Sequence, residues 1–92
     1  MQKIVLQIIN EVGLHARPAS EFVKLAGQFK AKVQIRNKSK DSQMVDAKSI
    51  LSVLILGAEK GHEIELTADG EDEKEAIEAL RDLIESDFAG NF

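Results

Sequence analysis

His15 stands where the sequence changes from a turn to a helical pattern, within the segment GLHARPA at residues 13–19. Pro18 is typical of the first turn of a helix, because its missing N–H needs no partner there and its ring would clash deeper in the helix. This spacing predicts that His15 lies at or next to the N-cap, beside the free backbone N–H groups of Ala16 and Arg17. Those groups and the positive end of the helix dipole form an anion site, on which a phosphate carried by His15 would lie.

The chemistry open to His15 at that place is nucleophilic attack on phosphorus. The helix dipole disfavours the imidazolium form, so the neutral ring keeps a lone pair for the attack. The guanidinium of Arg17 is suited to neutralising phosphoryl oxygens. A lone histidine near a helix start is more often a surface capping residue with no chemical role. The complete seven-residue segment favours a phosphate-carrying histidine over that simpler interpretation.

The second histidine, His62, is predicted to be a surface residue, because it lies between Gly61 and Glu63 where a strand begins. The two histidines show no spacing that a metal site would need, and the chain has no cysteine. We therefore expect neither a metal ion nor a cofactor.

Composition restricts the class of protein further. The 92 residues allow one domain, residues 1–92, and the hydrophobic fraction of 43% with only four Phe predicts an aliphatic core. The net charge of -4 argues against nucleic-acid binding, which relies on a basic face. No apolar run reaches the roughly 18 to 20 residues of a membrane span, and the N-terminus does not resemble a signal peptide. A cytoplasmic protein without membrane insertion is expected.

Hydrophobic periodicity predicts the elements that must position His15. Alternation predicts strands at residues 4–9, 32–36, 44–45 and 63–68, and spacings of three and four predict helices at 16–29 and 71–84. The apolar segment 49–56 fits a buried strand or a short helix by periodicity alone. Ser49 as an N-cap and Gly57 as a stop favour the helix. The resulting order β-α-β-β-α-β-α indicates an α+β domain, with an antiparallel sheet covered on one face by helices.

The segment GLHARPA is similar to the active-site motif of the HPr family, the histidine-containing phosphocarriers of the phosphoenolpyruvate-dependent phosphotransferase system. The resemblance runs essentially from end to end. It includes Lys48-Ser49-Ile50, which looks like the regulatory-serine segment of the family, and an acidic start to the last helix. The resemblance implies an open-faced β-sandwich, in which three helices lie on one face of a four-stranded antiparallel sheet.

The resemblance also implies a function and a set of partners. His15 would accept phosphate through Nδ1 from a phosphohistidine on enzyme I and donate it to EIIA-type domains of a sugar permease or to a regulator. The chain would then be a monomeric phosphocarrier and not an enzyme. The family further implies a serine kinase/phosphorylase that would modify Ser49.

Two departures from the family pattern leave questions open. The loop at 37–43 looks a few residues longer than in sugar-branch members and resembles nitrogen-branch paralogues, so the acceptor is not fixed. The sequence LSVL at 51–54 replaces the Met-Gly pair and further Met of many Gram-positive members. Ser49 can therefore be a regulatory phosphoserine or only an N-cap. The presence of His15 argues against the catabolite-regulator paralogues, which lack that histidine.

We expect an exposed apolar docking patch around His15, with a core position for Leu51 and Leu54 as the alternative. Its expected members are Ile50, Leu51, Leu54, Ala16 and Ser20, ringed by Arg17, Lys24 and Lys48. Two other functions are weighed against a carrier. One is a pure interaction module in which His15 is incidental. The other is an enzyme with His15 as general base, which is disfavoured because no nearby carboxylate is spaced to orient the ring.

Overall fold

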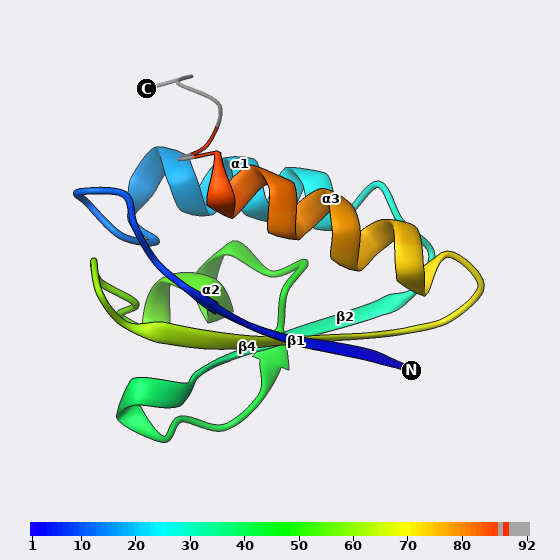
Figure 1. Cartoon of the computed structure of the whole chain (residues 1–92), viewed down its shortest axis with the longest axis horizontal. Helices are drawn as coiled ribbons and strands as arrows, with labels where there is room; N and C mark the ends of the chain where they lie inside the picture. The colour runs from blue at the N-terminus through cyan, green and yellow to red at the C-terminus, as the bar shows by residue number, and fades with distance from the viewer. Residues whose placement is uncertain (87, 89–92) are drawn as a thin grey trace.

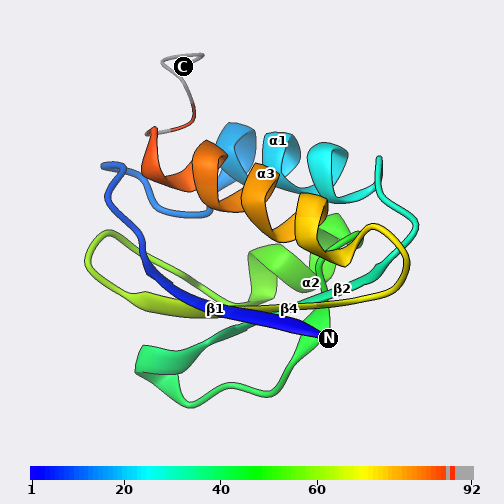
Figure 2. The ribbon, with the colours of Figure 1, turned by 45° about the vertical axis from the view of Figure 1, so that its right-hand side comes forward.

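The computed structural model describes residues 1–86 and 88, and α1, α2 and α3 lie on one side of a single sheet (Figures 1 and 2). The described elements are β1 (Gln2–Gln7), α1 (Ala16–Ala26), β2 (Lys32–Asn37), the short 3-10 helix η1 (Lys38–Lys40), β3 (Val45–Asp46), α2 (Ile50–Ile55), β4 (Glu63–Asp69) and α3 (Glu73–Glu85). The predicted α+β open-faced sandwich is confirmed. None of these helices is long and apolar enough to cross a membrane, among the residues that the structure describes.

The four strands form one antiparallel sheet in the order β1-β4-β2-β3. The central strand β4 pairs along nearly its whole length with both β1 and β2, so that Leu66 lies opposite Ile4 on one side and Ile35 on the other. Alternation along these strands turns one set of apolar side chains toward the helices. The sheet therefore supports the helices and the loop before α1.

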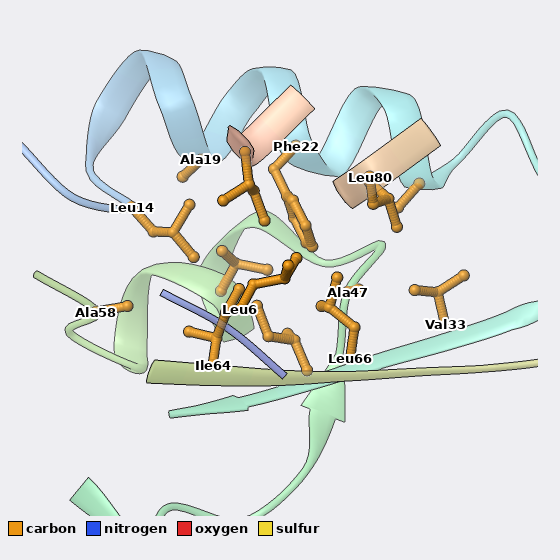
Figure 3. Packing of buried hydrophobic residues seen from close by; sticks show 14 of the residues in the cluster. Leu6, Leu14, Ala19, Phe22, Val33, Ala47, Ala58, Ile64, Leu66 and Leu80 are labelled. Atoms are coloured by element: carbon orange, nitrogen blue, oxygen red, sulfur yellow. The ribbon is translucent and has the colours of Figure 1, made fainter. Parts of the chain in front are cut away.

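The core lies between the sheet and the helices. Phe22 of α1 and Leu80 of α3 point toward Leu66 of the sheet (Figure 3) and are completely buried. Most of the buried side chains around them are aliphatic, as the composition predicted. Burying such side chains supplies most of the free energy that holds a small domain together.

The central strand is buried on its second face as well. Glu65 points away from the helices, yet it is nearly buried because Arg36 and Lys3 on the flanking strands cover it. Arg36 Nε donates to Glu65 Oε1 at 2.6 Å and Lys3 Nζ lies 3.3 Å from Oε2. The bond from Arg36 lowers the pKa of Glu65, and partial desolvation opposes that shift. This charged cluster covers the middle of the sheet face opposite α1, α2 and α3.

Several element boundaries differ from the prediction. The first helix was expected to continue to residue 29 but ends at Ala26, because Gln28 and Phe29 donate their N–H groups to Leu25 and Ala26 in a tighter turn. The short third strand lies at Val45–Asp46, one residue later than predicted. The last helix begins at Glu73 and not at residue 71, with Asp72 at its N-cap.

Candidate functional site

His15 is the N-cap residue of α1, as the position of Pro18 predicted. Its backbone is extended, with φ of -104° and ψ of 166°, and its exposed side chain makes no capping hydrogen bond to the helix. Pro18 lies buried in the first turn. The imidazole is therefore held at a helix start while its ring remains open to solvent.

Two backbone donors lie open beside this ring. The first hydrogen bond along α1 runs from Ala19 N to His15 O at 3.0 Å, and Pro18 has no N–H. Within residues 1–86 and 88, the N–H groups of Ala16 and Arg17 have no hydrogen-bond acceptor. Open donors at the positive end of a helix dipole stabilise an anion. The arrangement can hold a phosphoryl group that is attached to His15.

Ala16 occupies a strained backbone conformation that the sequence did not reveal. Its φ is 24°, on the positive side that non-glycine residues rarely adopt. Such a conformation costs about 1 to 3 kcal/mol and persists only where the surrounding structure imposes it. Strain of this kind is often found at functional sites. The strained residue directly follows the histidine, and its own N–H is one of the two open donors.

An open depression of about 580 Å³ surrounds the histidine and is lined by Val12, His15, Ala16, Arg17 and Pro18. Four of these residues belong to the predicted segment. Val12 is a further member that the sequence did not single out, because no local pattern shows that this apolar residue is 58% exposed. The depression is broad enough for another protein surface to approach the imidazole.

The loop before His15 is pressed against a second segment of the chain. Gly13 has φ of 67°, and a Cβ at this residue would lie 2.3 Å from Ala58 O. The next N–H, that of Leu14, donates to the same carbonyl at 2.8 Å, and Leu14 itself is buried. Any other residue at position 13 would force the loop and the segment at Ala58 apart.

The predicted apolar docking residues of α2 are exposed. Leu51 is 70% exposed and Leu54 39%, whereas Val53 between them is completely buried. The alternative that placed Leu51 and Leu54 in the core is therefore wrong. Ile55, which the sequence analysis did not include, is 80% exposed on the last turn of α2. α2 packs against α1, the helix that begins after His15 (Figure 1).

The basic residues predicted to ring the patch lie at two different places. Arg17 is exposed in the first turn of α1, next to His15. Lys24 lies in the last turn of α1, which is about 16 Å long, and Lys48 Nζ donates to Phe29 O just beyond that end. Of the three cations, only Arg17 lies in the turn of α1 that begins at the histidine. Ser20 and Ala16 are exposed along the first half of α1.

Ser49 is the N-cap of α2, as one of the two interpretations predicted. Its Oγ accepts a hydrogen bond from Ser52 N at 3.4 Å, and its backbone carbonyl accepts from Val53 N at 3.1 Å. This hydroxyl therefore satisfies a donor that would otherwise be free at the start of the helix.

His62 is not the simple surface residue that the sequence suggested. Its ring is half-buried, and Nδ1 accepts from Glu59 N at 3.1 Å and lies 3.2 Å from Asn37 Nδ2. With two donors facing Nδ1, the neutral ring carries its hydrogen on Nε2. The role of His62 is to close the turn before β4. Among the residues that the structure describes, no three His, Cys, Asp or Glu side chains gather as a metal ion would require.

Comparison with known proteins places this site in a family context. Residues 2–86 match the sequence pattern described as the PTS HPr component phosphorylation site. The phosphocarrier protein HPr of Neisseria meningitidis serogroup A is 46% identical over 88 residues, which cover 96% of each chain. A crystal structure of HPr from Thermoanaerobacter tengcongensis is 43% identical and covers all of both chains with a TM-score of 0.91. A second structure from that organism, described as an HPr dimer, is 45% identical with a TM-score of 0.74 and covers 96% and 98% of the two chains.

Proposed function

The chain belongs to the HPr family of phosphocarriers of the phosphotransferase system, and on this premise we propose that it carries phosphate on His15 between enzyme I and EIIA-type acceptor domains. The observation that carries the proposal is the exposed imidazole at the N-cap of α1, beside the open N–H groups of Ala16 and Arg17. A phosphoryl group on His15 meets donors and a positive dipole that are already in place.

The transfer step balances without any further reactant. The lone pair of His15 Nδ1 forms a bond to phosphorus, while the bond between phosphorus and the donor's imidazole nitrogen breaks and its electron pair stays on that nitrogen. The donor leaves as a neutral imidazole, and the His15 ring becomes a phosphoimidazolium with its hydrogen still on Nε2. The reverse sequence at an acceptor returns His15 to the neutral form. Nothing is oxidised or reduced, so the step needs no redox cofactor.

The residues around His15 contribute to phosphate binding in different ways. The N–H groups of Ala16 and Arg17 donate to phosphoryl oxygens, and the Arg17 guanidinium neutralises the remaining charge. Pro18 starts the helix that aligns these donors. Because the phosphorus passes between two nitrogen atoms, fixed donors that favour its spread negative charge lower the barrier in both directions.

Docking of the donor and the acceptors is assigned to the exposed face of α2 and the adjoining part of α1. Ile50, Leu51 and Leu54 supply the apolar contact. Exposed large apolar side chains on so small a domain are typical of a surface that a partner covers. Ser20, Lys24 and Lys48 form the polar edge of this surface, where charge complementarity would steer an acidic partner.

Ser49 is proposed as a site at which a serine kinase/phosphorylase could regulate docking. A phosphate there adds about -1.5 to -2 charges beside Ile50 and Leu51, which a partner must desolvate. The capping hydrogen bond of Ser49 supports a structural role in any case. We further propose that the carrier acts as a monomer in the cytoplasm.

A phosphorylation assay with enzyme I and phosphoenolpyruvate tests the proposed function. The chain is expected to gain one phosphate that is labile in acid and stable in base, and His15→Ala is expected to gain none. His62→Gln is the matched control. It removes the other histidine, whose ring contacts Asn37 and Glu59 and does not line the depression around His15, so phosphate uptake should be unchanged. Undiminished uptake in His15→Ala, or no uptake by the wild type, would contradict the proposal and favour an interaction module.

A further inference from the structure

We infer that Asn10 is a positioning residue for His15, because its buried side-chain amide fixes the peptide plane between Gly13 and Leu14. The inference rests on the proposed role of His15 as the phosphate carrier. It adds a residue that acts through the backbone and does not touch the phosphate. The relevant contacts all lie in the loop that leads from β1 to α1.

Asn10 forms hydrogen bonds with both backbone polar groups of Gly13, the N–H and the carbonyl. The Asn10 carbonyl accepts from Gly13 N at 3.2 Å, which closes a four-residue turn. The Asn10 side-chain Nδ2 then donates to Gly13 O at 2.8 Å. The second bond is made by a side chain, so a substitution can remove it without altering the backbone of the turn.

The carbonyl of Gly13 and the N–H of Leu14 belong to one rigid peptide unit. The carbonyl end is held by Asn10 Nδ2, and the N–H end donates to Ala58 O at 2.8 Å. Rotation of this unit would break both bonds and would move Leu14, whose side chain is buried. The unit directly precedes Leu14 and His15, so its orientation sets the direction in which the chain enters the helix start.

The amide of Asn10 is not accounted for by stability alone. Asn10 is only 6% exposed, and its Oδ1 is buried with no hydrogen-bond partner among the described residues. A buried acceptor without a partner costs free energy that an apolar side chain of similar shape would not incur. The donor end of the amide is therefore the useful part of the side chain, and it is aimed at the loop that carries His15.

Phosphoryl transfer requires precise placement of the His15 ring. The His15 nitrogen must meet phosphorus in line while the phosphoryl oxygens reach the open N–H groups of Ala16 and Arg17. A displacement of about 1 Å in such an arrangement can lower a rate by about a hundredfold. Loss of one of the two bonds that hold the preceding peptide unit should have a smaller effect, on the order of tenfold.

Two variants and a control test the inference. Asn10→Leu keeps the approximate shape and removes both the donor and the unpaired acceptor, and Asn10→Ala serves if the leucine variant does not fold. Glu11→Gln changes the neighbouring residue of the same turn, whose exposed carboxylate pairs with Lys60 outside the site. The first measurement is hydrogen exchange of the Leu14 amide in the unphosphorylated protein. It should accelerate about tenfold in the Asn10 variants relative to the amides of β4.

The second measurement is the rate of His15 phosphorylation by phosphorylated enzyme I, well below the melting temperature of each variant. We expect kcat to fall about tenfold in the Asn10 variants with KM nearly unchanged, because docking residues are untouched. Glu11→Gln should match the wild type. An unchanged kcat, or Leu14 exchange equal to that of the wild type, would overturn the inference. Failure of the wild type itself to accept phosphate would instead refute the proposed function, and the exchange result would still decide whether Asn10 holds the loop.

Discussion

The helices α1 and α2 begin in opposite ways, although they pack against each other. At α2, Ser49 Oγ accepts from Ser52 N, so the first turn is closed by its own N-cap. At α1, His15 occupies the same position but makes no capping bond, and the following residue, Ala16, has a positive φ. A typical capping bond is worth about 1 kcal/mol, so α1 gives up stability that α2 obtains. The open start of α1 agrees with the phosphate site proposed there, whereas the capped start of α2 completes the fold.

The largest loss of stability is expected from Gly13→Ala, which disturbs the contact between the loop before α1 and Ala58. The added Cβ would lie 2.3 Å from Ala58 O, and alanine disfavours the positive φ of this residue. The variant should lose about 3 kcal/mol of unfolding free energy in urea denaturation. Gly61→Ala is the control, because a Cβ there meets open space within the described structure and only the positive φ contributes. Equal losses in the two variants would show that the loop is not packed as described.

Arg17→Gln should lower phosphate transfer by about ten- to a hundredfold, because a hydrogen bond to a charged group contributes about 1.5 to 3 kcal/mol. The melting temperature should not change, since Arg17 is exposed and forms no ion pair within the part of the chain that the structure describes. Stopped-flow transfer from enzyme I gives the rate. Lys24→Gln removes the same charge from the other end of α1 and should have a much smaller effect. Similar losses in both variants would point to long-range attraction and not to contact with phosphate.

Leu51→Glu tests the exposed face of α2. The substitution should slow transfer from enzyme I by about tenfold through loss of apolar contact, with an unchanged melting temperature. Val53→Glu is the contrasting variant, because this neighbouring side chain is completely buried and a charge there should unfold the domain. If Leu51→Glu also unfolds the protein, the exposed patch is part of the core and the docking assignment is wrong.

Ser49→Ala should cost about 1 kcal/mol of stability through the lost cap and leave transfer nearly intact. Ser49→Asp should retain the stability, because a carboxylate can cap the helix, and should slow transfer by placing charge beside Leu51. Thermal unfolding and the transfer rate are measured for both variants. Transfer by Ser49→Asp at the wild-type rate would leave only the capping role of Ser49.

The smallest effect is expected at the start of α3, where the N-cap residue Asp72 differs from both His15 and Ser49. Asp72 makes no side-chain cap to its own helix, and its carboxylate instead accepts from Lys30 N and Ala31 N, both at 2.8 Å. Those bonds, that of Lys30 first, hold the pKa of Asp72 below its ordinary value of 3.8, against a smaller effect of desolvation.

A carboxyl whose pKa is lower in the folded state stabilises the fold above its unfolded pKa, and this contribution is lost as the pH falls through the folded value. Unfolding free energy should therefore decrease on going from about pH 6 to about pH 3, and less steeply in Asp72→Asn than in the wild type. Identical pH dependence in the two proteins would show that the carboxylate does not hold the residues before β2.

The local rules of helix starts explain why much of the site could be predicted. Pro18 restricts the position of a helix turn through its own ring, and it located His15 at the N-cap. Ser49 was recognised as a cap for a comparable reason. The strand pattern likewise predicted the sheet, because alternation is imposed by the backbone of each strand.

Features that depend on distant contacts could not be obtained in that way. The role of His62 depends on Asn37 and Glu59 reaching the same ring nitrogen, and no local pattern encodes that meeting. The positive φ of Ala16 is likewise imposed by the surrounding fold, since alanine itself disfavours it. The exposure of Ile55 depends on how α2 lies against α1, which periodicity over six residues does not determine.

Amide NMR of the phosphorylated chain can show whether the open N–H groups at the start of α1 bind the phosphate on His15. We expect the amide protons of Ala16 and Arg17 to shift strongly downfield on phosphorylation, as new donors to phosphate do. The amide of Ser52, already bound to Ser49 Oγ, should remain where it is. Unshifted Ala16 and Arg17 amides in a chain that carries phosphate on His15 would show that these N–H groups do not hold the phosphate.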